Sequence, residues 1–108
     1  MNTLLTQPTG MDKKDWIAGL DKGLAMLQTF DEHNPRLTAT QAAQRCGLTR
    51  TAARRYLLTL LHLGFVATDG KLFWLTPKVM RLGQSYLESA RLPRIVQPSL
   101  QRLAMGTQ

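Results

Sequence analysis

The stretch over residues 37–63 constrains the fold of this chain most, because it contains start and stop signals for two short helices in succession. Thr38 and Gln41 form the S/T-x-x-Q pattern of a capping box, which predicts a helix that begins at about Ala39. Gly47 can adopt the positive φ that ends a helix, so the first helix is expected to stop beside it. Local signals therefore define both ends of this helix.

A second helix is expected directly afterwards. Thr49 is its predicted N-cap, the helix runs to about Leu63, and Gly64 ends it. Two helices separated by about three residues around a glycine are the helix-turn-helix arrangement. The residues that fit its inward and crossing positions are small or apolar: Ala42, Ala43, Cys46, Leu48, Ala53 and Tyr56.

The flanking segments predict the rest of a small domain. An apolar stripe at spacings of three and four predicts a helix over residues 16–30. Residues 65–68 and 71–75 are expected to be strands joined by a tight Asp69-Gly70 turn, and residues 36–37 could add a third strand. We therefore expect a mainly α-helical fold with a small β-hairpin, which is a winged helix-turn-helix followed by a linker helix.

The linker helix is predicted by Thr76-Pro77, an N-cap followed by proline at the first helical position. Its apolar stripe is too rich for a lone exposed helix, so it should pack on the domain, on a second subunit, or on both. Residues 91–93 break it, and residues 95–105 are expected to form a further helix without a partner in the chain.

The charge of the chain is concentrated in its middle. Of the formal net charge of +7, the segment over residues 33–68 carries five arginines and no acidic residue, whereas residues 1–32 carry five acidic residues and three lysines. Arginine suits bidentate recognition of phosphate and of guanine edges. The segment therefore indicates a polyanionic partner.

Several other functions are excluded by length and composition. A chain of 108 residues has room for one small domain, and a large enclosed catalytic pocket is not expected in it. Cys46 is the only cysteine, and His33 and His62 have no second ligand at a suitable spacing. No nucleophile elbow, phosphate-binding loop or paired-carboxylate pattern occurs, so we expect no enzymatic activity, no metal and no cofactor.

Three stretches resemble the N-terminal half of IclR-type bacterial transcription regulators: GLDKGLAMLQTF, LTATQAAQRCGLTRTAARRYLLTLLHLGFV and KLFWLTPKVMRLGQSYL. The RTAARRYLLTL helix and the FWLTPKV ending are most similar to the branch that regulates aromatic-acid catabolism through the β-ketoadipate pathway. The resemblance implies a winged helix-turn-helix, a linker helix and a larger effector-binding domain. It also implies an aromatic-acid effector, but only for the full-length parent.

With this resemblance, we expect four segments. They are a disordered tail over residues 1–14, a winged helix-turn-helix DNA-binding domain over 15–76, a linker and dimerisation helix over 77–91, and the start of a missing effector-binding domain over 92–108.

In this kind of fold the second helix of the motif enters the major groove with its N-terminal residues at the base edges. We expect base contacts from Arg50, Thr51 and Arg54, because arginine can fork onto guanine and the threonine methyl can meet thymine. Phosphate contacts are expected from Thr38, Thr40, Gln41, Arg55, Thr59 and Lys71.

A single winged helix contacts few bases, so a homodimer on a (pseudo)palindromic operator is expected. The resemblance places its contacts on the first helix and the linker helix, at Leu20, Leu24, Val79, Leu82 and Tyr86. We expect such a protein in the cytoplasm, at the nucleoid, and not at a membrane, since the longest uncharged run is too short to cross one.

Two other functional classes remain open from the residues alone. A winged helix can serve as a protein–protein interaction module without specific DNA readout, and a basic helix can attach to a membrane surface. The acid-free segment argues against the first, and the small inward residues argue against the second.

Overall fold

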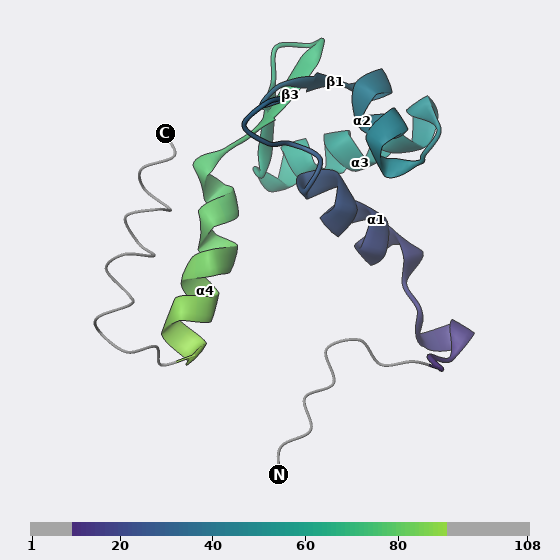
Figure 1. Ribbon diagram of the computed structural model, residues 1–108, viewed down its shortest axis with the longest axis vertical. Coiled ribbons are helices and arrows are strands. Elements are labelled where there is room, and N and C mark those ends of the chain that lie inside the picture. Colours follow the sequence, from purple (N-terminus) through teal and green to yellow (C-terminus); the bar gives the residue numbers. More distant parts are fainter. Residues whose placement is uncertain (1–9, 91–108) are drawn as a thin grey trace.

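Three helices and a small sheet enclose the core, and a fourth helix leaves it, in the computed structural model, which describes residues 10–90 of the chain (Figure 1). Its elements in chain order are η1 (Lys13–Asp15), α1 (Ala18–Leu27), β1 (Leu37–Thr38), α2 (Ala39–Cys46), α3 (Arg50–Leu63), β2 (Val66–Thr68), β3 (Leu72–Leu75), η2 (Pro77–Val79) and α4 (Met80–Ala90). The predicted mainly helical fold with a small β-hairpin is confirmed, and the sheet has a third strand.

Both ends of α2 are fixed by the residues that the sequence indicates. Thr38 Oγ1 accepts a hydrogen bond from the Gln41 N–H at 3.2 Å, and Gln41 Oε1 accepts one from the Thr38 N–H at 2.8 Å. Gly47 has a φ of 67° and lets the Leu48 N–H return to the Ala43 carbonyl at 2.9 Å. Because a helix of 8 residues is not stable by propensity alone, it needs these caps together with its buried contacts.

The core lies between α1, α2, α3 and the inner face of the sheet. Met26, Ala42, Ala53 and Leu57 have 0% solvent exposure. The alanines allow α2 and α3 to approach closely, so a larger side chain there would push the two helices apart. Cys46 packs against this cluster, and burial raises the pKa of its thiol above the usual 9.0, as suits a packed residue.

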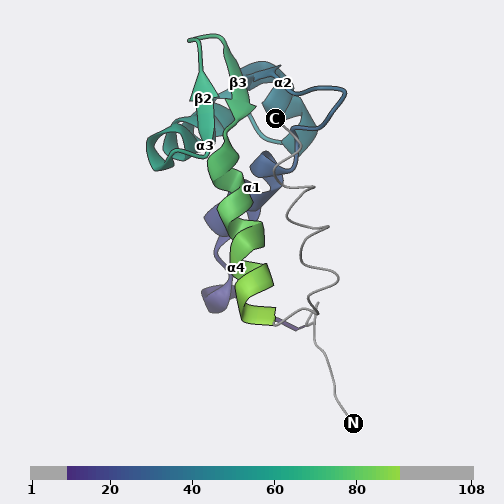
Figure 2. The same cartoon turned by 90° about the vertical axis from the view of Figure 1, so that its left-hand side faces the viewer.

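The sheet has the strand order β1-β3-β2 and is antiparallel throughout. Strand β1 begins one residue later than the expected residues 36–37, because Leu37 pairs with Phe73 and Thr38 with Leu72. Figure 2 shows β2 and β3 extending beyond the helices as the wing.

Hydrogen bonds to Asp69 close the turn of the wing. Asp69 Oδ1 accepts from the Lys71 N–H at 2.9 Å and from the Leu72 N–H at 2.8 Å, and Thr68 Oγ1 accepts from the Gly70 N–H at 3.0 Å. Gly70 has a φ of 103°, a conformation that favours glycine. The N–H groups of Leu72 and Lys71 hold the pKa of the Asp69 carboxyl below its usual 3.8, because they stabilise the ionised form.

Helix α1 is shorter than the predicted helix over residues 16–30. Ile17 is extended, with φ −112° and ψ 98°, and offers no side-chain cap. At the other end, the hydroxyl and the N–H of Thr29 both donate to the Met26 carbonyl, at 2.6 and 3.2 Å, and this turn ends the helix. Trp16 lies before α1 and is 54% exposed.

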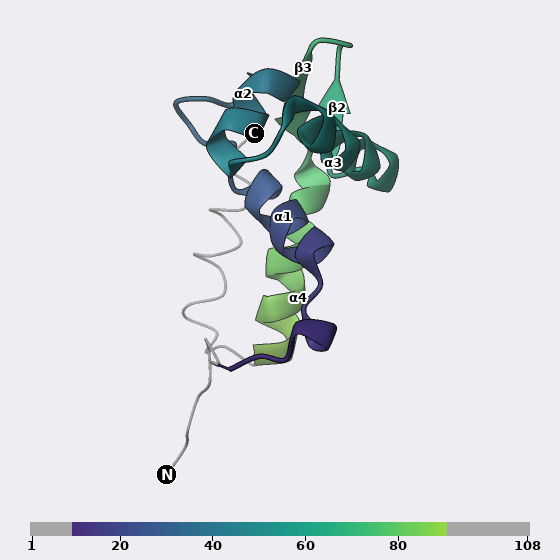
Figure 3. The ribbon, with the colours of Figure 1, turned by 90° about the vertical axis from the view of Figure 1, so that its right-hand side faces the viewer.

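Helix α4 starts after a 3-10 turn capped by Thr76, whose Oγ1 accepts from the Lys78 N–H at 3.3 Å. It runs away from the sheet in all three views (Figures 1, 2 and 3). Within residues 10–90 its main contacts are with η2, the turn that directly precedes it, and Leu87 is its one buried residue. The helix predicted over residues 95–105 lies outside the described residues.

Among the helices that the structure describes, none has both the length and the apolar character needed to cross a membrane.

Leu57→Ala should lower the free energy of unfolding by about 2–5 kcal/mol, because the fully buried side chain leaves a cavity. Chemical denaturation measures this. The matched control is Leu58→Ala on the same helix, where the side chain is 40% exposed and the loss should be below about 0.5 kcal/mol. Equal losses in the two variants would contradict this orientation of α3.

The lowered pKa of Asp69 predicts a pH-dependent stability. The ionised carboxylate stabilises the fold above the unfolded-state pKa near 3.8, and this contribution is lost as the pH falls through the lower folded-state pKa. Asp69→Asn keeps an oxygen acceptor but cannot titrate. The wild-type protein should therefore be more stable than the variant at neutral pH, and the difference should shrink in acid. Unfolding midpoints across a pH series test this, and a pH-independent difference would count against it.

Candidate nucleic-acid interface

The N-terminal half of α3 presents a basic exposed face. The residues predicted to meet DNA there are all exposed: Arg50, Thr51, Arg54 and Arg55. The opposite face of the helix is buried through Ala53, Leu57 and Leu60. Thr49 Oγ1 accepts from the Ala52 N–H at 3.1 Å and fixes the start of the helix. The cap and the burial together determine which side chains face outward.

The arginines of this face have no ion-pair partner within residues 10–90. The ion pairs found there join Lys14 to Asp12, Lys22 to Asp21 and Arg45 to Asp31, and His33 Nε2 lies 3.5 Å from a carboxylate oxygen of Glu32. Arg50, Arg54 and Arg55 thus keep their full positive charge and their N–H donors. An anion with several closely spaced charges is the partner that such a surface suits best.

The start of α2 lies next to the wing. Thr38 pairs with Leu72, the residue after Lys71, so the sheet brings the cap of α2 close to the exposed lysine of the wing. The capping box occupies one oxygen of Thr38 and one of Gln41 as acceptors, and leaves the hydroxyl proton and the amide NH₂ as donors. Thr40 is exposed beside them. This edge of the domain therefore gathers hydrogen-bond donors and one ammonium group.

Thr59 differs from the other predicted phosphate contacts. Its hydroxyl donates to the Arg55 carbonyl one turn earlier, at 2.8 Å. The proton that would bind a phosphate is therefore already used inside α3.

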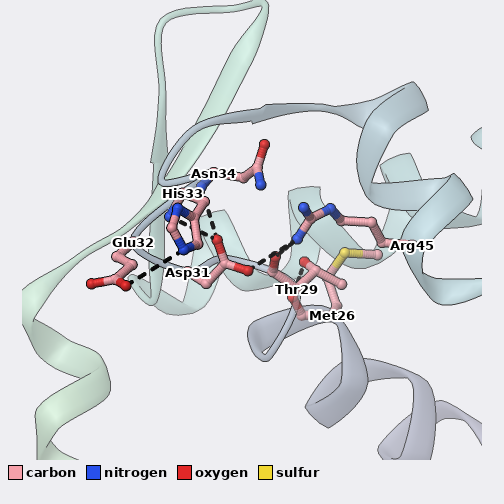
Figure 4. A network of polar contacts seen from close by, with 7 residues as sticks. All are labelled: Met26, Thr29, Asp31, Glu32, His33, Asn34 and Arg45. Atoms are coloured by element: carbon pink, nitrogen blue, oxygen red, sulfur yellow. Dashed lines mark hydrogen bonds and ion pairs between the residues drawn. The ribbon is translucent and has the colours of Figure 1, made fainter.

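Arg45 has a role in the fold that sequence reasoning missed (Figure 4). Its Nη1 donates to the Thr29 carbonyl at 2.6 Å and contacts Asp31 Oδ2 at 3.4 Å. Asp31 Oδ1 accepts from the N–H groups of His33 and Asn34, at 3.0 and 2.8 Å. The Asn34 N–H and Arg45 lower the pKa of the Asp31 carboxyl. Arg45 thus joins the loop after α1 to α2 through Nη1.

Arg36 was also unassigned by the sequence. Its guanidinium lies 4.0 Å from the centroid of the Trp74 ring, a cation–π contact on the sheet. The signal for it is the strand register, because Leu37 opposite Phe73 puts Arg36 opposite Trp74. Two of the five arginines in the basic segment therefore have intramolecular partners, and three on α3 do not.

The side chains predicted for dimerisation lie on α1, η2 and α4. Leu20, Leu24, Leu82 and Tyr86 are large apolar residues between 47% and 60% exposed, and Val79 is half-buried. The structure leaves most of this apolar surface uncovered by the rest of residues 10–90.

Comparison with known proteins assigns the domain. Residues 19–70 match the IclR helix-turn-helix domain. The chain is 52% identical over 94 residues to the p-hydroxybenzoate hydroxylase transcriptional activator of Acinetobacter baylyi, covering 87% of this chain and 35% of that protein. It is 48% identical over 94 residues to the Pca operon regulatory protein of the same bacterium, covering 87% and 34%.

A solved structure of an IclR family regulator has a similar fold. The IclR family transcriptional regulator from Brucella abortus superposes with a TM-score of 0.69 at 26% identity, over 82% of this chain and 35% of that one. The chain spans about a third of the length of the curated relatives it matches. The family consists of transcriptional regulators and not of enzymes. Residues 19–70 are the helix-turn-helix DNA-binding domain of this family, and the chain belongs to the IclR family.

Proposed function

We propose that the protein binds an operator as a symmetric dimer, with α3 of each subunit in the major groove. The observation that carries this proposal is the exposed face of α3, where three arginines lack an ion-pair partner within residues 10–90. A DNA duplex supplies both the phosphates and the base edges that such a face needs.

Base contacts come from the first turns of α3. Arg50 and Arg54 are four residues apart and point to the same side of the helix, so they can reach neighbouring base pairs. Thr51 lies beside them and offers a methyl group for thymine. Arg55 is turned further around the helix, toward the phosphates.

Phosphate contacts surround this reading face. Thr38, Thr40 and Gln41 offer side-chain and backbone donors at the start of α2, and Lys71 offers its ammonium from the wing. Thr59 contributes least, because its hydroxyl proton is bound to Arg55.

The dimer forms through the apolar surfaces of α1 and α4. Leu20 and Leu24 lie exposed on α1, and Leu82 and Tyr86 lie exposed on α4. Gly19 and Gly23 add little bulk to α1, and a Cβ at Gly23 would meet no atom within 4 Å in this subunit. A second copy that covers these side chains removes apolar area from water at about 25 cal/mol per Å².

The regulated genes belong to aromatic-acid catabolism. This part of the proposal rests on the similarity to the p-hydroxybenzoate hydroxylase activator and the Pca operon regulator. An aromatic acid is the effector of the full-length regulator, and the protein acts at the nucleoid in the cytoplasm. Binding selection on random DNA duplexes would give the operator and its half-site spacing.

Arg54→Ala and Arg55→Ala should separate base reading from phosphate binding. Arg54→Ala should cost about 1–3 kcal/mol on the selected operator and relax the sequence preference at one position. Arg55→Ala should weaken binding equally on operator and random DNA, and lower the slope of log K against log salt by about 0.9. Fluorescence anisotropy over a salt series measures both. An equal loss of affinity of Arg54→Ala for operator and random DNA would contradict a base contact of Arg54.

Leu20→Asp combined with Tyr86→Asp should dissociate the dimer. A buried, unpaired carboxylate costs several kcal/mol, so dimer affinity should fall by roughly 100-fold or more. Sedimentation velocity without DNA measures the change, and circular dichroism checks the fold. Leu58→Asp is the control, because Leu58 is an exposed apolar residue on α3 that is not part of the proposed dimer surface. A wild-type protein that stays monomeric at every concentration would exclude this dimer.

A further inference from the structure

Three consecutive carbonyls at the end of α3 accept hydrogen bonds from the segment that begins the linker. Lys78 Nζ donates to the Leu63 carbonyl at 2.5 Å, Thr76 Oγ1 donates to the Gly64 carbonyl at 2.6 Å, and the Thr76 N–H donates to the Phe65 carbonyl at 2.9 Å. The two donating residues stand more than ten positions after the carbonyls they bind. We call the five residues of this arrangement the joint.

The joint meets a requirement of the helix end. Gly64 takes a φ of 90°, and the N–H groups of Gly64 and Phe65 return to the Leu61 and Leu60 carbonyls, at 3.0 and 2.9 Å. This turn satisfies carbonyls inside the helix, but the carbonyls of Leu63 and Gly64 have no partner from α3. The positive charge of Lys78 also suits the negative end of the helix dipole.

The lysine is held in place along its length. A Cβ added at Gly64 would meet Lys78 Cδ at 3.3 Å and Nζ at 3.5 Å, so the side chain lies directly over the glycine. Its ammonium lies 5.1 Å from the centroid of the Phe65 ring. Lys78 is an exposed residue, but its side chain lies along the end of α3 and its ammonium contacts both the Leu63 carbonyl and the Phe65 ring.

Helix α4 begins at Met80, two residues after Lys78, and within residues 10–90 its main contacts are with η2, the turn that directly precedes it. The joint is thus the main structural link that sets the direction of α4 relative to α3. We propose that Thr76 and Lys78 are positioning residues that set the angle between the recognition helix and the linker helix, and thereby the half-site spacing that a dimer accepts. This inference rests on the proposed dimer through α1 and α4.

The angle between α3 and α4 determines how far apart the two α3 helices of the proposed dimer lie. In a dimer joined by α4, the two α3 helices can meet two half-sites only if their separation and rotation match the duplex. Each base pair inserted between half-sites rotates one of them by about a tenth of a turn and moves it along the axis. A defined angle at the joint therefore selects one spacing, whereas a loose angle accepts several.

The test uses the operator from binding selection, with base pairs inserted or removed between its half-sites. Wild-type protein should prefer the selected spacing. Lys78→Met keeps an apolar side chain over Phe65 but removes the charge and the donor, and should reduce that preference by about fivefold, the factor expected for one net hydrogen bond. Lys78→Arg should restore it. Arg81→Met, an equal loss of charge three residues later on exposed α4, should leave the preference unchanged.

A second variant removes a different hydrogen bond of the joint, so that the result does not depend on Lys78 alone. Thr76→Val removes the bond to the Gly64 carbonyl and should also flatten the spacing profile, while Thr76→Ser should keep it. Circular dichroism and sedimentation confirm that each variant is a folded dimer. A wild-type spacing profile in both Lys78→Met and Thr76→Val would overturn the role of the joint alone. If the wild-type protein shows no spacing preference, the proposed symmetric dimer fails and this inference fails with it.

Discussion

The structure depends on how the ends of its short helices are satisfied. Helix α2 has 8 residues and α3 has 14, lengths at which helix formation is marginal in water. Thr38 and Thr49 cap the two starts, and Gly47 and Gly64 turn the chain back at the two ends. These caps hold the helices at the lengths that place Ala42 and Ala53 in one buried core cluster. The orientation of α3, and with it the direction of its arginines, follows from that packing.

The five arginines of the basic segment divide between fold and function. Arg45 binds the loop after α1, and Arg36 stacks on Trp74, so both have partners inside the chain. The three on α3 have none within residues 10–90. Composition alone counts all five as one positive patch, whereas in the structure the three arginines without an intramolecular partner within residues 10–90 all lie on α3. This concentration is what distinguishes a DNA-reading face from general basicity.

Sequence predicts the parts of this fold that depend on neighbouring residues. The capping box of Thr38 and both glycine stops were found because each involves residues a few positions apart. Contacts between distant residues were not found: Arg45 reaches back 16 residues to Thr29, and Lys78 reaches back 15 to Leu63. The limits of α1 were also misjudged, because the turn at Thr29 competes with the apolar stripe. The exposed face of α3 can be predicted from the spacing of its apolar residues. Which arginines lack a partner within residues 10–90 depends on the tertiary structure.

The joint lies at the end of α3 opposite to the one proposed to meet the bases. A helix of 14 residues is about 20 Å long at 1.5 Å per residue. A tilt of about 5° at its C-terminal end would move the side chains at its start by about 1.7 Å, which is more than the tolerance of a hydrogen bond to a base edge. Arg50 and Arg54 lie at that far end, whereas Lys78 binds the Leu63 carbonyl. Because the core holds α3 within the domain, a small rotation at Leu63–Phe65 turns the whole domain relative to α4. In the proposed dimer, the hydrogen bonds of the joint therefore limit how far the first turns of α3 move away from their half-site.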